Sequence, residues 1–228
     1  MSAELLHLLQ LADPTLPIGG FSHSSGLETY VQAGIVNDAA SAKSFVVEML
    51  TQNLQYTDAA LMSLAYNAAI NNDIEQLLLL DAECTAVKLP QEMRQASQKL
   101  GTRLLKIFQP FCGSGMINQY KTAIDTKQTN GNYCISFGLI AATLQIPKQE
   151  ALTGFYYNAA MGMITNCVKL IPLGQQDGQQ LLFAIKPLLT SLTALSMHPD
   201  RDLIGLCCPG FDVRCMQHED LYSRLYMS

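Results

Sequence analysis

The chain has 228 residues, a net charge of −5 at pH 7 and a hydrophobic fraction of 49%, whereas only 14% of its residues are charged. The acidic balance argues against a nucleic-acid partner, because binding to phosphates needs clustered Lys and Arg. The low charge fraction indicates that a partner protein covers part of the apolar surface.

The first 24 residues predict a helix that is followed by an elbow. Leucines at intervals of three and four place one apolar face on a helix over residues 4–12. Proline ends that helix because it has no amide hydrogen, and glycine allows backbone angles that are closed to other residues. We expect four residues to shape the elbow, namely Pro17, Gly19, Gly20 and Gly26. The alternative is a turn that only changes the direction of the chain.

The middle of the chain predicts helices that are separated by polar turns. A short helix from about residue 25 to 34 is expected first, capped by a serine at position 22, 24 or 25. Asp38 is expected to cap the next helix. Further helices are predicted over about 57–70, from 74 onward, from Pro90 to the connection at 110–115, over 116–127 and over 133–145.

The last third predicts two long helices. Residues 148–170 are apolar on most faces, which makes this segment the candidate for the central helix and favours a buried helix over a membrane span. Pro172 and Gly174 break it, and helical periodicity resumes over 175–196, where Pro187 should kink or divide the helix. No alternating strand pattern occurs, so we expect an all-α, single-domain bundle of about ten helices over residues 1–228.

The sequence contains no complete catalytic motif. The glycine-rich segments lack the lysine of a nucleotide-binding loop, and Ser22 is not in a Gly-x-Ser-x-Gly elbow. His218 and Glu219 begin a zinc-protease pattern, but the residue four after His218 is Tyr222. We therefore expect neither an enzyme nor a bound cofactor.

One group of residues is suited to metal binding. Cys207, Cys208, Cys215 and His218 lie within a dozen residues and offer thiolate and imidazole ligands, although no Cys-x-x-Cys pair is present. The seven cysteines are otherwise scattered, which favours reduced thiols and a cytoplasmic protein. Two interpretations of this group stay open: the cysteines form a metal site, or they are buried thiols with no such role.

The positions of several basic residues follow from the helices on which they are predicted to lie. Lys169 lies near the end of the long apolar helix, where a cation stabilises the helix end or contacts a carboxylate of a partner or of an internal network. Lys99, Arg103 and Lys106 lie at helical spacing, which is typical of a solvated helix face.

Three segments together resemble the UreF family of urease accessory proteins. The first is Leu16-Pro-Ile-Gly-Gly-Phe-Ser-His-Ser-Ser-Gly-Leu-Glu28, and the second is Val168-Lys-Leu-Ile-Pro-Leu-Gly-Gln175. The third is the tail, Met216-Gln-His-Glu-Asp-Leu-Tyr-Ser-Arg-Leu-Tyr226. Their order and their positions at the start, in the late middle and at the end of the chain carry the resemblance.

The resemblance implies an all-α homodimer that is not an enzyme. Such a protein joins the UreD (UreH) accessory protein to the GTPase UreG, and the assembly inserts nickel into apo-urease in a GTP-dependent step. Residues 198–228 would form a tail that binds a partner, with Arg224 and Phe21 supporting the surface that receives UreG. The full set of expected partner-binding residues is Phe21, Ser22, Glu28, Lys169, His218, Glu219, Tyr222, Ser223, Arg224, Leu225 and Tyr226.

Two other functions remain alternatives. The first is a metal-binding module that relays nickel itself through the group formed by Cys207, Cys208, Cys215 and His218. The second is an unrelated helical enzyme. Many members of the family have His near the position of Asn132, which weakens the case for a metal site at that turn.

Overall fold

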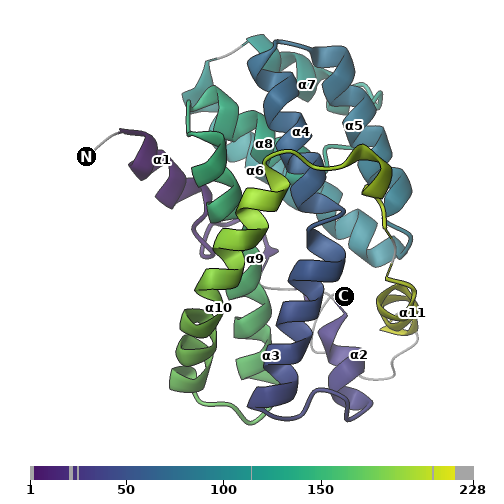
Figure 1. Ribbon diagram of the computed structural model, residues 1–228. Helices are drawn as coiled ribbons and strands as arrows, with labels where there is room; N and C mark the ends of the chain where they lie inside the picture. Colours follow the sequence, from purple (N-terminus) through teal and green to yellow (C-terminus); the bar gives the residue numbers. More distant parts are fainter. Residues whose placement is uncertain (1–2, 21–22, 25, 114, 207, 219–228) are drawn as a thin grey trace.

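Helices make up most of the chain in the computed structural model, which describes residues 3–20, 23–24, 26–113, 115–206 and 208–218. Eleven α-helices and no strands occur in these ranges, so the expected all-α bundle is confirmed (Figure 1). The helices are α1 (Ala3–Leu11), α2 (Leu27–Gln32), α3 (Ala39–Glu48), α4 (Asp58–Ile70), α5 (Ile74–Val87), α6 (Gln91–Cys112), α7 (Gly115–Asp125), α8 (Tyr133–Thr143), α9 (Lys148–Leu170), α10 (Gln175–Ser196) and α11 (Pro209–His218).

The most deeply buried helix is α8, which packs between α4 and α6. Every residue from Cys134 to Ala142 is buried, so this helix has no polar face. Its Gly138 brings the two backbones close, because a Cβ at that position would lie 2.6 Å from the carbonyl oxygen of Met62 on α4. The longer α9, which the sequence favours as the central helix, instead has exposed residues near both ends, such as Thr153 and Lys169. None of the helices in the described ranges is both long and apolar enough to cross a membrane.

Two prolines lie inside helices that the sequence predicts to end or divide there. Pro110 belongs to α6, which continues to Cys112, and Pro187 belongs to α10, which is one uninterrupted helix. Both prolines are exposed, and so is Phe183, whose carbonyl loses its helical donor at Pro187. Water can bond to that carbonyl, so the predicted connection at 110 and the division at 187 are wrong.

The structure also contains elements that the sequence did not predict. Between α3 and α4 the chain forms a π-helix, η2 (Met49–Leu54), and a 3₁₀ turn, η3 (Arg201–Leu203), follows α10. The helix α11 is the most consequential addition, because it carries the start of the tail. The predicted cap at Asp38 is confirmed, since its side chain accepts a hydrogen bond from the amide of Ser41.

A buried carboxylate fixes the turn between α7 and α8. Asp81 on α5 has no exposed surface, and it accepts hydrogen bonds from the backbone amides of residues 130–132 at 2.8–2.9 Å. The hydroxyls of Thr129 and Tyr120 also donate to it, as does the side-chain amide of Asn132. Because this negative charge is paired with so many donors, its burial is tolerated and the turn has one conformation.

We expect Asp81→Asn to lower the free energy of unfolding by about 2–3 kcal/mol, because an amide NH₂ would face donors that now share a carboxylate oxygen. Urea denaturation followed by circular dichroism measures this loss. Asp125→Asn is the control, since Asp125 is exposed and pairs with Lys121 on the surface. The control should change stability by less than about 0.5 kcal/mol, and equal losses in the two variants would contradict the role of Asp81.

Candidate partner-binding site

Two asparagines of α9 hold the elbow between α1 and α2. Asn158 donates its side-chain amide to the carbonyl oxygen of Ala12 at 3.1 Å, and Asn166 donates to that of His23 at 2.9 Å. The two contacts lie at either end of the elbow. Since the turns of the elbow leave backbone carbonyls without helical partners, these bonds fix its path over α9.

Arg103 of α6 holds the middle of the elbow. Its guanidinium donates to the carbonyl oxygen of Ile18 at 2.9 Å and lies directly beneath Gly19, where a Cβ would be 2.3 Å from the Nη1 atom. The sequence predicts Lys99, Arg103 and Lys106 as one solvated face, and all three residues are exposed, but Arg103 also bonds to the elbow. Periodicity alone cannot show that one arginine of a helix face reaches a distant carbonyl.

The start of α2 differs from the expectation. Gly26 is the N-cap residue, with φ of 78°, and it has no side chain to accept a bond from the helix. The predicted serine cap is therefore wrong for Ser24, whose hydroxyl is buried and makes no hydrogen bond. The other two serines, Ser22 and Ser25, lie outside the described residues.

The helix α11 packs against α2 and α6 (Figure 1). Its inner face carries Phe211, Cys215 and His218, which are spaced by four and three residues and are all buried. Gly26 allows this approach, since a Cβ there would lie 2.7 Å from the Cys215 sulfur and 3.1 Å from the Phe211 ring. The elbow glycine and the start of the tail are thus in direct contact.

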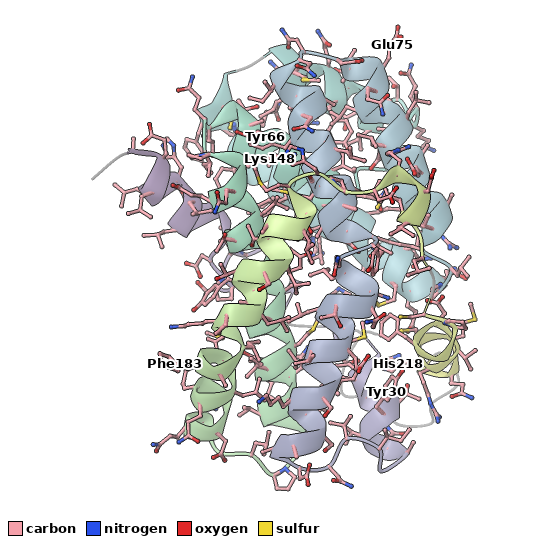
Figure 2. All side chains as sticks on the ribbon, viewed as in Figure 1. Tyr30, Tyr66, Glu75, Lys148, Phe183 and His218 are labelled. Carbon is pink, nitrogen blue, oxygen red and sulfur yellow. The ribbon has the colours of Figure 1, made fainter. Side chains whose placement is uncertain are left out.

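A buried histidine joins the elbow to the tail. His218 is the last residue of α11 (Figure 2). Its Nε2 lies 3.2 Å from Glu28 Oε2, and its Nδ1 lies 2.8 Å from Glu92 Oε2. The side chains of His218 and Glu28 are 1% and 3% exposed. We call this contact of α11 with α2 and α6 the His218 bridge. Because both nitrogens of the ring face carboxylates, the orientation of the ring and the position of α11 are fixed together.

The sequence predicts Glu28 and His218 as residues that touch a partner. In this structure the two side chains contact each other and are buried, and their contact with a partner stays a prediction. Their geometry fits residues that position the segments on either side of them. Arg214, one turn before His218, adds an outer contact by lying 5.9 Å from the centre of the Tyr30 ring.

The second segment of the resemblance forms the junction between α9 and α10. Lys169 is exposed in the last turn of α9, and Pro172 follows the end of that helix. Gly174 is the N-cap residue of α10, and its amide donates to Asp177 Oδ2 at 2.8 Å. This junction connects to the elbow through Asn166, which lies on α9 three residues before Lys169.

Several expected site residues lie outside the described residues. They are Phe21, Ser22, Cys207, Glu219, Tyr222, Ser223, Arg224, Leu225 and Tyr226. Their roles stay predictions.

The candidate metal group is only partly described. Cys208 Sγ lies 3.4 Å from the carbonyl oxygen of Gln52, Cys215 packs against Gly26, and His218 lies between two carboxylates. Burial raises the pKa of the Cys215 thiol well above its usual value. Among the residues described, these three do not converge on a common point as metal ligands would.

A cavity of about 230 Å³ lies beneath the elbow. Ile18, Gly20 and His23 line one side, and Phe211 of α11 also contributes to its wall. Deeper in the bundle, Asp58 and Lys88 line the cavity and form an ion pair at 2.6 Å, with side chains 14% and 12% exposed. Burial lowers the pKa of Lys88, but its neighbours, chiefly the Asp58 carboxylate, together outweigh this effect and raise it.

Comparison with known proteins identifies the family. The profile of the UreF family matches residues 36–186. The chain is 48% identical to the urease accessory protein UreF of Actinobacillus pleuropneumoniae serotype 5b over 225 residues, which cover 99% of each chain. It is 46% identical to that of Haemophilus influenzae strain KW20 (99% of this chain, 96% of the other) and 35% identical to that of Bacillus sp. strain TB-90 (99% of each). The chain belongs to the UreF family.

Membership of the UreF family confirms the resemblance that the three segments predict, and it makes the protein a urease accessory protein. The matches to the first two relatives extend over nearly the whole chain. The elbow and the start of the tail, which the His218 bridge connects, therefore belong to the part of the chain shared with these relatives.

Sequence analysis missed three residues of this site: Arg103, Glu92 and Asn166. Glu92 occupies the first turn of α6, where an acidic side chain is ordinary because it favours the helix N-terminus. Asn166 appears only as a polar residue within an apolar helix. A buried polar residue at such a position needs a hydrogen-bond partner. That requirement was the one signal in the sequence that Asn166 contacts another segment.

Gly26→Ala should disturb the docking of α11, and Gly34→Ala is a matched control. Both glycines have positive φ, but a Cβ at Gly34 meets no atom within 4 Å. Each variant should lose about 1–2 kcal/mol through backbone strain, and Gly26→Ala should lose about 1–3 kcal/mol more through overlap with Cys215 and Phe211. Urea denaturation of the two variants measures the difference, and equal losses would contradict the close packing.

His218→Ala should release α11 from α2 and α6, because it removes the contacts with the buried Glu28 and the half-buried Glu92, at a cost of about 3 kcal/mol. We expect faster amide hydrogen exchange over residues 209–218, measured by mass spectrometry, with little change in α8. The control is Gln217→Ala, at an exposed neighbouring position. Unchanged exchange in His218→Ala would mean that apolar contacts alone hold α11.

Proposed function

We propose that this chain is a non-catalytic adaptor in urease maturation. It joins the UreD (UreH) accessory protein to the GTPase UreG, so that nickel enters the apo-urease active site in a GTP-dependent step. The observation that carries the proposal is the His218 bridge, which brings together the elbow and the start of the tail, two segments 190 residues apart in the sequence.

The position of the bridge supports one shared recognition surface. Glu28 lies seven residues after Phe21, and His218 lies six residues before Arg224, the two residues to which the family resemblance gives a role in receiving UreG. The bridge therefore anchors both segments near the residues in question. An adaptor needs such anchoring, because a surface that is ordered before binding loses less entropy on association.

The tethering of the elbow supports the same proposal. Arg103, Asn158 and Asn166 hold its carbonyls from two different helices. A Pro/Gly turn that served only to reverse the chain would not need three long-range side-chain contacts. The elbow is therefore better explained as a shaped surface than as a simple connection.

Exposed apolar side chains indicate where protein partners bind. Leu6 and Leu9 of α1 are 57% and 60% exposed, and Phe111 and Phe183 are 72% and 71% exposed. Large apolar residues at this level of exposure favour association with other proteins. We assign these surfaces to UreD and to a second copy of the chain, in a homodimer located in the cytoplasm.

Co-purification with UreD and UreG tests the adaptor function. The parent should form a complex that contains both partners. Arg224→Ala and deletion of residues 220–228 should lose UreG, because they remove the expected contact residue and the tail that carries it. Size-exclusion chromatography with quantification of each subunit provides the measurement.

Arg201→Ala is the matched control, since Arg201 is an exposed arginine that pairs with Glu83 at 2.9 Å. It should retain both partners. Circular dichroism of each variant must show an unchanged helical content, so that loss of UreG reports on binding and not on folding. A parent that binds neither protein, or an Arg224→Ala variant that retains UreG in full, would overturn the proposal.

A further inference from the structure

Three possible metal ligands meet at a junction of three helices, away from the His218 bridge. Asp58 is the first residue of α4, Cys84 lies on α5, and Cys134 is the second residue of α8. One ligand atom from each lies within 4.8 Å of the others, and both cysteines are fully buried. This is the group that satisfies these distances in the described part of the chain.

We propose that Asp58, Cys84 and Cys134 form a binding site for one divalent cation of the zinc and nickel class. Two thiolates and one carboxylate suit such borderline cations and do not suit Ca²⁺ or Mg²⁺, which prefer oxygen ligands alone. The proposal rests on the geometry of this cluster and is independent of the adaptor function.

The distance between the sulfurs fits a shared cation. The two Sγ atoms are 3.5 Å apart. Two thiolates that bind one tetrahedral zinc at about 2.3 Å are about 3.8 Å apart. A change of a few tenths of an ångström, within the reach of side-chain rotation, would bring both sulfurs into place. The helices α5 and α8 therefore need not move apart.

The charges balance in both states of the site. Without a cation, the Asp58 carboxylate is neutralised by Lys88 at 2.6 Å and the two thiols are neutral. On binding, the thiols lose two protons, and the cation, two thiolates, one carboxylate and one ammonium again sum to zero. A site this deeply buried has to avoid net charge, because an uncompensated charge in the interior is very costly.

The cavity under the elbow provides access. Asp58 and Lys88 line it, so a cation that enters the cavity can reach the Asp58 carboxylate. Lys88 caps the end of α5, four residues after Cys84. Its ammonium would turn from the Asp58 carboxylate toward the new thiolates and stabilise them. A water molecule in the cavity would supply the fourth ligand of a tetrahedral cation.

Metal titration of the reduced full-length chain tests this proposal. We expect one equivalent of Zn²⁺ to bind in competition with a chromophoric chelator, with release of two protons into weak buffer. Anaerobic titrations with Ni²⁺ and with Co²⁺ as a spectroscopic probe should give the charge-transfer absorption of metal–thiolate bonds. X-ray absorption of the zinc-loaded parent should show two sulfur ligands at about 2.3 Å.

Single substitutions place the ligands. Cys84→Ser and Cys134→Ser should each weaken binding by at least about 100-fold, since even changes around the ligands cost about 10- to 100-fold. Cys167→Ser is the matched control, because Cys167 is a fully buried cysteine on α9 whose pKa is raised to about 12 by burial. The control should bind as the parent does.

The outcomes distinguish this site from others. Binding that survives in both serine variants, or that is lost on replacement of Cys207 and Cys208, would overturn the proposal. Absence of zinc-binding by the folded parent would overturn it as well. If a serine variant fails to fold, the sulfur count and bond length in the parent still decide, since one sulfur or none at the cation contradicts the proposed ligands.

Discussion

The contact of His218 with Glu28 and Glu92 is the constraint on which the candidate site depends. It joins α11 to α2 and α6, and the side chains of His218 and Glu28 are almost inaccessible to water. Hydrogen bonds are directional, whereas apolar contacts tolerate small shifts of one helix against another. The apolar residues Phe211 and Cys215 therefore hold α11 against the bundle, and His218 fixes its position relative to α2 and α6.

That constraint is useful only because the surface beneath it is rigid. The turn between α7 and α8 is held by Asp81, and α8 itself is buried between α4 and α6. The elbow then lies on α6 and α9, bound by Arg103 and two asparagines. The core helices fix α6 and α9, and these two helices hold the elbow. The position of the elbow therefore depends on the packing of the core.

The sequence predicted the helices well, because apolar periodicity and capping residues are local signals. It predicted the extent of α9 and the cap at Asp38. It was wrong about a connection at Pro110 and a division at Pro187, because exposure, which is not local, decides the cost of a proline in a helix. The site was harder. Glu28 and His218 drew attention through family resemblance, yet their mutual contact depends on the path of the whole chain, and Glu92 gave no signal at all.

Several ionisable groups of this protein that are buried or nearly so make their contacts at junctions between elements. Asp81 on α5 binds the turn between α7 and α8, Asp58 and Lys88 lie at helix ends, and His218 lies where the tail begins. Apolar helix faces pack in several registers at similar cost, whereas each of these polar clusters satisfies its bonds in one arrangement only. In a chain with 19 acidic and 14 basic residues, these few buried charges specify how the helices connect. Two of these junctions are also the sites proposed above: the contact of the elbow with the tail for partner proteins, and the thiol cluster by the cavity for a cation.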